Sequence, residues 1–188
     1  MELTGETSIA APREKVWDAL NDPDVLARCI DGVESLTRES DTRFSGRLAA
    51  SVGPVKAKFS GAVNLSELDP PHRYVLSGEG KGGVAGFVKG SAEVILSELA
   101  DGGTHLRYVA KSQVGGKLAQ LGARLIEGTA KGYAERFFAA LKAEVESPAP
   151  APEEPQVTPE PTPAGLPPMV WLGVLVAAVI LLLFFLMR

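Results

Sequence analysis

The chain of 188 residues has one cysteine, two histidines and no long run of charge of one sign. A single cysteine, Cys29, cannot form a disulfide within the chain, and the first fifteen residues lack the apolar run of a signal peptide. We therefore expect a reduced, cytoplasmic environment. Residues 1–146 carry 18 of the 19 basic and 20 of the 23 acidic residues, so this part is nearly neutral. Without a basic stripe to neutralise phosphates, nucleic-acid binding is not expected.

The few residues that could perform catalysis or bind a metal are isolated from one another. His72 follows two prolines in a turn, and His105 is expected to point outward from the start of a strand. Neither histidine has a second ligand at a metal-binding spacing. Cys29 falls on the apolar side of a short predicted helix, where a cysteine usually behaves as a small hydrophobic residue. The sequence therefore predicts neither a catalytic residue nor a metal site.

A glycine-rich stretch, residues 78–86, matches the dinucleotide-binding fingerprint through Gly78, Gly80 and Gly83. That motif requires a helix whose N-terminus faces the pyrophosphate, whereas residues 84–96 have the pattern of a strand. We therefore predict no nucleotide site. We expect instead a mobile hairpin at one end of a sheet, which could act as a lid.

The chain ends in an uncharged run, residues 169–187, followed only by Arg188. As a helix this run would span about 28 Å, close to the thickness of about 30 Å of a bilayer's hydrocarbon core. Thirteen of its residues are Leu, Ile, Val or Phe. Their insertion would contribute about −4 to −8 kcal/mol. The run predicts a transmembrane tail anchor, with the rest of the chain in the cytoplasm.

Residues 147–168 contain nine of the fourteen prolines and too little apolar surface to fold. We predict a disordered spacer that would reach at most about 68 Å as a polyproline helix and about 26 Å as a flexible coil. Such a tether would keep the preceding domain near the bilayer and raise its local concentration there.

Residues 1–146 have the pattern of an α+β domain with an antiparallel sheet. Residues 2–10 alternate in polarity like a half-buried strand, and apolar residues at helical spacing predict two short helices, opened by Pro12 and by the Asn-Asp-Pro of residues 21–23. Six further strands are predicted at about 33–39, 42–52, 55–67, 73–80, 87–98 and 104–114. Residues 116–146 are apolar on one side only, which predicts one long helix that closes the domain.

One face of the predicted sheet carries very small side chains. Taking alternate residues, this face contains Gly46, Gly61, Gly78 and Gly90, with alanines among them. A curved sheet lined in this way cannot fill the space beneath one helix to normal packing density, so we expect an apolar hollow. In an alternative interpretation the glycines only allow the sheet to bend, and the helix side chains fill the gap.

Motifs that carry a family resemblance lie at six places: V-W at 16–17, N-D-P at 21–23, L-A-R-C-I-D-G-V-E at 26–34, G-P-V-K-A-K-F-S-G at 53–61, residues 118–125 with Gly122, and F-F at 137–138. Over about residues 1–146 the chain resembles the carbon monoxide dehydrogenase G-subunit family, within the START-like, polyketide-cyclase-related SRPBCC superfamily. The resemblance implies a helix-grip fold (START or Bet v 1-like), in which an antiparallel sheet wraps around a long C-terminal helix. Asp31 departs from the family, which usually has proline there.

The resemblance also implies a function. Members of this family are accessory proteins of molybdenum-containing carbon monoxide dehydrogenases or related hydroxylases, which they recruit to the cytoplasmic membrane, and some members bind a respiratory quinone. Together with the hollow and the tether, this leads to the hypothesis of a tail-anchored, non-enzymatic carrier of menaquinone or ubiquinone. Large residues of the inner face and the closing helix are expected to line the ligand site: Phe44, Leu48, Phe59, Val63, Tyr108, Leu121, Leu125 and Phe137.

Three questions stay open at this point. Tyr108 could orient a quinone carbonyl, or it could be an ordinary core tyrosine. The domain could be an adaptor that docks the dehydrogenase while its interior is packed shut, in which case enlarging Gly61 or Ala92 would change nothing. A cyclase-like enzyme is a further alternative, which rests on superfamily analogy alone.

Overall fold

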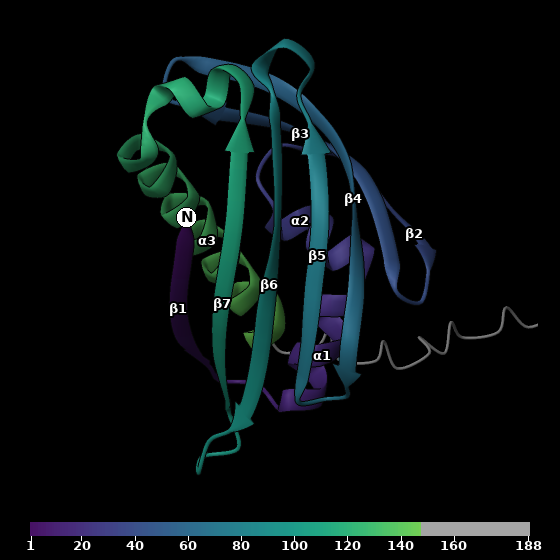
Figure 1. Ribbon diagram of the computed structural model, residues 1–188. Helices are drawn as coiled ribbons and strands as arrows, with labels where there is room; N and C mark the ends of the chain where they lie inside the picture. The colour runs from purple at the N-terminus through teal and green to yellow at the C-terminus, as the bar shows by residue number, and fades with distance from the viewer. Residues whose placement is uncertain (148–188) are drawn as a thin grey trace, which may run out of the picture. The chain divides into compact units, whose positions relative to one another are not determined.

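The computed structural model describes residues 1–147, in which a curved sheet packs around three helices (Figure 1). The strands are β1 (Glu2–Ile9), β2 (Val33–Ser40), β3 (Arg43–Val52), β4 (Val55–Asp69), β5 (Arg73–Lys81), β6 (Phe87–Glu98) and β7 (Thr104–Gly115). The helices are α1 (Arg13–Asn21), α2 (Pro23–Cys29) and α3 (Ala123–Glu146), with 3₁₀ turns η1 (Gly83–Ala85) and η2 (Gly116–Leu121).

The sheet is one antiparallel layer of seven strands in the order β1-β7-β6-β5-β4-β3-β2. After β1 the chain runs through α1 and α2 to the opposite edge of the sheet and then returns strand by strand to β7. The observed strands match the predicted ones to within two residues at each end. This confirms the α+β prediction of an antiparallel meander with a long helix at its end.

The two short helices begin at the residues that predicted their N-termini. Pro12 precedes α1, and the side chain of Asp22 accepts a hydrogen bond of 2.8 Å from the backbone N–H of Asp24 at the start of α2. Pro23 occupies the first position of α2, where its missing N–H costs no hydrogen bond. The prediction of two helices separated by Asn-Asp-Pro is confirmed.

The prediction of one continuous helix over residues 116–146 is wrong. Gly122 adopts a φ of +86°, which separates the 3₁₀ turn η2 from α3. A positive φ ends a right-handed helix, and glycine is the residue that adopts it at least cost. Leu118 and Leu121 therefore belong to η2 and not to α3.

Two predicted segments lie outside the described residues. These are the transmembrane anchor at 169–187 and the spacer at 147–168, apart from Ser147. None of the helices within residues 1–147 has the length and hydropathy that crossing a membrane requires.

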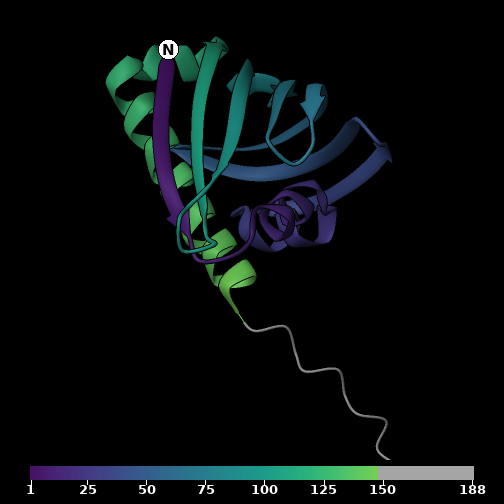
Figure 2. The same ribbon diagram turned by 90° about the horizontal axis from the view of Figure 1, so that it is seen from below.

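The fully packed core lies at one end of the sheet, the lower end in Figure 1, where α1, α2 and the last turns of α3 meet the strands. Figure 2 shows these helices inside the curve of the sheet. Leu106 and Leu141 are completely buried there, and Trp17 packs edge-on against Tyr74 with 5.4 Å between ring centres. This cluster fixes the C-terminal half of α3 to the sheet.

We expect Leu141→Ala to lower the free energy of unfolding by about 2–5 kcal/mol, because it leaves a cavity where α3 meets the core. Val84→Ala is the control: Val84 is 85% exposed, so the change should stay within about 0.5 kcal/mol. Urea denaturation of the full chain, followed by far-UV circular dichroism, measures both. Equal stability of the two variants would contradict this position of the core.

Candidate binding site

The predicted lining residues of β3 and β4 face each other in two cross-strand pairs. Phe44 lies directly opposite Val63, and Leu48 lies opposite Phe59. All four occupy the sheet face that turns toward the helices, as the alternation predicted. Phe44 is buried beneath the guanidinium of Arg38, 5.9 Å from the ring centre, whereas the other three are only partly buried. The pairs form one continuous apolar strip on the inner face.

Tyr108 and Phe137 belong to a second apolar group, on the other side of the inner face. Tyr108 stacks on Phe138 with 5.1 Å between ring centres, and Phe138 meets Phe137 edge-on at the same distance. β7 is three strands from β4, and Tyr108 pairs with Val94 toward the α1–α2 end of the sheet, whereas Phe59 lies near the β3–β4 turn, so the two groups are separated both across and along the strands. Phe138 was noted in the family motif but was not among the predicted lining residues.

The Tyr108 side chain crosses the edge strand β1 at Gly5, its register partner. A Cβ at Gly5 would lie 2.6 Å from the Tyr108 hydroxyl oxygen, so only glycine leaves room for the phenol. The ring lines a cleft of about 380 Å³ between β1 and α3, to which Phe138, Lys131 and Glu135 also contribute. The hydroxyl thus lies at a boundary between the inner face and solvent.

The first half of α3 contacts the β3–β4 hairpin through a small number of residues. Leu125 is 41% exposed, yet its side chain touches the turn at Gly53, where a Cβ would approach it to 2.8 Å. The hydroxyl of Tyr133 accepts a hydrogen bond of 3.3 Å from the backbone N–H of Ser51. Leu121, in η2, is partly buried. These residues bring α3 over the β3–β4 strip without sealing it.

Asp31 helps to hold α3 in place over the sheet. Its carboxylate accepts a hydrogen bond from Arg136 of α3, and the Arg136 guanidinium lies 4.6 Å from the ring centre of Tyr133. The residue that departs from the family pattern therefore ties the loop after α2 to the middle of α3. Both side chains of the ion pair are about half exposed, so its contribution to stability is expected to be below about 1 kcal/mol.

The inner-face glycines serve the bend of the sheet. A Cβ at Gly46, Gly61, Gly78 or Gly90 would lie 2.3–2.6 Å from a carbonyl oxygen of a neighbouring strand. Real Cβ atoms do not approach so closely, so the backbone itself excludes side chains here. These four positions support the bending interpretation and are not by themselves evidence of empty space.

Evidence for unfilled space comes from the apolar side chains around these glycines. Leu48, Val52, Phe59 and Val63 face the helix side of the sheet, yet each stays partly accessible to solvent. At the α1–α2 end, residues of the same sheet face such as Leu106 are completely buried. The space between the sheet and α3 is therefore packed at one end and incompletely filled at the other.

The chemistry available on the inner face is apolar contact along the β3–β4 strip and the hydroxyl of Tyr108 in the second group. Burial raises the pKa of the Tyr108 phenol, and the Glu135 carboxylate raises it further, so the hydroxyl is protonated and can donate a hydrogen bond. Cys29 is buried in the core, and burial raises the pKa of its thiol, which disfavours the reactive thiolate. Within residues 1–147, no three potential metal ligands come together.

A family model described as the carbon monoxide dehydrogenase G-subunit (CoxG) matches residues 5–146. A conserved protein from Geobacillus kaustophilus of known crystal structure is 31% identical, with a TM-score of 0.73, and the match covers 78% of this chain and 95% of that one. The comparison with curated proteins found no match.

More distant solved structures share the fold. A START superfamily protein from Mycobacterium smegmatis is 14% identical with a TM-score of 0.58, over 77% of this chain and 97% of that one. The Zhui aromatase/cyclase from Streptomyces sp. R1128 is 16% identical with a TM-score of 0.58, over 78% and 93%. At these identities the likeness is one of fold alone and adds no support for a shared reaction.

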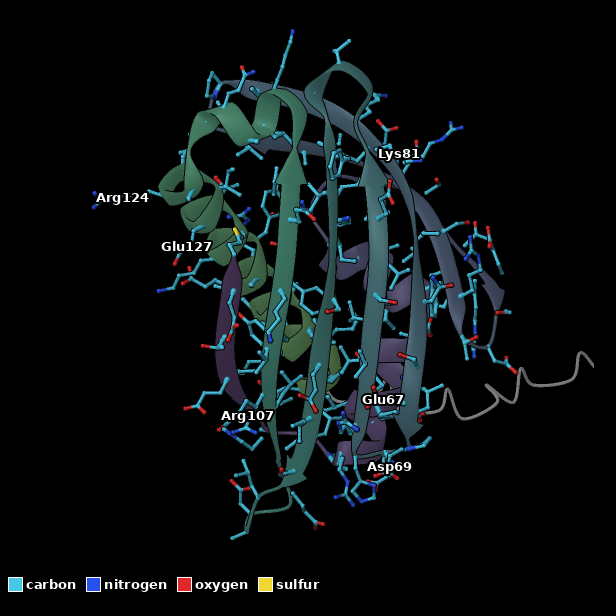
Figure 3. All side chains as sticks on the ribbon, in the orientation of Figure 1. Glu67, Asp69, Lys81, Arg107, Arg124 and Glu127 are labelled. Carbon is cyan, nitrogen blue, oxygen red and sulfur yellow. The ribbon has the colours of Figure 1, made fainter. Side chains whose placement is uncertain are left out.

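We expect Glu135→Gln to lower the pKa of Tyr108, because it removes a negative charge that disfavours the phenolate. The pKa should still stay above that of a free tyrosine, since burial is the larger cause. NMR titration of the full chain with ¹³Cζ-labelled tyrosine measures the shift. Glu127→Gln, on the same helix (Figure 3), should leave Tyr108 unchanged; an equal effect of both variants would contradict the assigned contact.

Proposed function

Because the chain belongs to the carbon monoxide dehydrogenase G-subunit (CoxG) family, as its motifs predicted, we propose that it is an accessory protein that binds a hydrophobic ligand. The ligand is a respiratory quinone, menaquinone or ubiquinone. The partner is a molybdenum-containing carbon monoxide dehydrogenase or a related hydroxylase. The protein holds this enzyme near the cytoplasmic membrane and carries quinone between the two.

The observation that carries the proposal is the incomplete packing between the sheet and the first half of α3. Leu48, Phe59 and Val63 form an apolar wall that stays partly accessible to solvent. Covering such a wall with an apolar ligand is favourable by about 25 cal/mol per Å². The isoprenoid tail of a quinone presents the extended apolar surface that this wall would cover.

The quinone head group needs a hydrogen-bond donor, and Tyr108 is the candidate. Its phenol stays protonated because burial and Glu135 both raise its pKa. The hydroxyl crosses Gly5 at the boundary of the β1–α3 cleft. In the proposed complex it would donate to a quinone carbonyl close to solvent, while the tail lies along the inner face.

The segments beyond residue 147 supply the link to the membrane. In this proposal residues 169–187 anchor the chain in the bilayer, and residues 147–168 let the cytoplasmic domain move between bilayer and enzyme. The bilayer interior and the apolar wall are similar surroundings for an isoprenoid chain, so the net free energy of transfer between them is small. Loading and release can then both occur without an added energy source.

Quinone bound by the domain should depend on free space at Ala92, which lies on the inner face of β6 between Leu76 and Ala110. We expect Ala92→Leu to reduce the quinone that co-purifies with the full chain about tenfold, since the larger side chain would take space from the ligand, and overfilling the occupied site costs about 1–3 kcal/mol. Solvent extraction of the detergent-purified protein and mass spectrometry measure the amount. Gly61 is a poorer choice, because a side chain there would collide with the carbonyl oxygen of Glu79.

Ser97→Leu provides the matched control, because Ser97 lies on the same strand but on the outer face and is exposed. It should bind as much quinone as the unsubstituted chain. If Ala92→Leu also retains all of its quinone, the inner face is not the ligand site, and the protein acts as an adaptor only.

Deletion of residues 169–188 should move the protein from the membrane fraction to the soluble fraction of cells that express it. The dehydrogenase should move with it, because the tail is the proposed link between them. Immunoblots of fractionated cells measure both proteins. An unrelated apolar segment of equal length should restore the membrane location, and a truncated chain that stays with the membrane would contradict the proposed anchor.

A further inference from the structure

The outer face of the sheet, away from the helices, carries a shallow trough of about 1140 Å³. Residues of β1 and of β3–β7 line it, so it runs across the strands. Figures 1 and 3 look onto this face, with Lys81 at its upper end. Gly61, Gly78 and Gly90 are among the residues that line it.

The register places a polar row across the floor of the trough. Lys111 on β7 lies opposite Ser91, which is followed by Ser77, Asn64 and finally Arg43 on β3. Four strand spacings separate the two basic residues, a distance of about 19 Å. Small hydroxyl and amide side chains between two cations leave the floor open and able to form hydrogen bonds.

Basic side chains exceed acidic ones around the trough. Arg43, Lys81, Lys89 and Lys111 line it, against Glu2 and Glu79. Lys111 lies 3.9 Å from Glu2 and Lys81 lies 3.6 Å from Glu79, so these two pairs are loose and exposed. Lys89 makes no ion pair with any other described residue. Arg43 is paired with Glu39 at 2.6 Å, so the lysines, Lys89 above all, supply the excess positive charge of this trough.

The shape and the charge select the kind of partner. A flat bilayer cannot reach the floor of a trough, whereas a single extended chain can lie in it. An extended peptide of about six residues spans the distance of about 19 Å between the two ends of the row. Acidic side chains on such a peptide would meet lysines at the rim, and its backbone would meet the serine hydroxyls of the floor.

We propose that this outer trough, Lys111 to Arg43, is the docking site for an acidic, extended segment of a partner protein. The inference rests on the proposed function only for the identity of that partner, the dehydrogenase. Electrostatic attraction at the exposed rim would mainly speed association and would weaken at high salt. A polar, shallow contact of this kind suits a partner that binds and leaves repeatedly.

A labelled octaglutamate peptide tests the site directly. Fluorescence anisotropy at low salt should show binding to the full chain in detergent. We expect Lys89→Glu/Lys111→Glu to weaken this binding at least about fivefold, because two attractive contacts become repulsive. The control Lys15→Glu/Lys117→Glu makes the same change in net charge at exposed residues outside the trough and should bind normally.

Three results would overturn the inference. If both double variants weakened peptide binding equally, the peptide would be attracted by the net charge of the molecule and not by the trough. If Lys89→Glu/Lys111→Glu lost binding to phosphatidylglycerol vesicles but kept binding to the peptide, the trough would be a lipid site. Peptide binding that appears only after Glu153, Glu154 and Glu160 are changed to Gln would make the chain's own spacer the occupant. The quinone content of each variant separates these results from failure of the proposed function, since the trough lies on the opposite face.

Discussion

A continuous sheet can curve around a helix only if its strands bend, and here the bend depends on glycines placed where strands approach too closely for a side chain. Gly61 and Gly46 lie opposite each other, as do Gly78 and Gly90. Their absent Cβ atoms remove collisions with carbonyl oxygens of neighbouring strands. The curvature that results lets the sheet pass around α3. The core then forms at one end only, where α1 and α2 fill the curve.

The alternation of β-strands lets one sheet serve two kinds of contact. On β4, Phe59 faces the helix side and its neighbour Ser60 lines the outer trough. On β5, Ser77 and Glu79 face outward on either side of Gly78. The inner face offers apolar surface and the outer face offers hydroxyls and positive charge. Under the two proposals made above, the protein would meet its cargo and a polar partner through opposite faces of the same strands.

Local patterns in the sequence predicted most of the fold. Alternating polarity located the strands, and Asp22 and Pro23 marked the start of α2, because these signals act within a few residues. The break at Gly122 was missed because glycine also occurs inside helices, and its positive φ depends on how η2 joins the sheet. Among the predicted lining residues, Leu48 and Phe59 meet, whereas Tyr108 lies across the sheet in a different group.

The sequence by itself determined which residues form strands and helices, which face of each strand is apolar, and which family the chain belongs to. These properties depend on periodicity and on short motifs. Only the tertiary structure decided that Tyr108 passes over Gly5, that Asp31 holds Arg136, and that Lys111 and Arg43 end the same row. Such relations join residues far apart in the chain, and the register between strands and the bend of the sheet establish them.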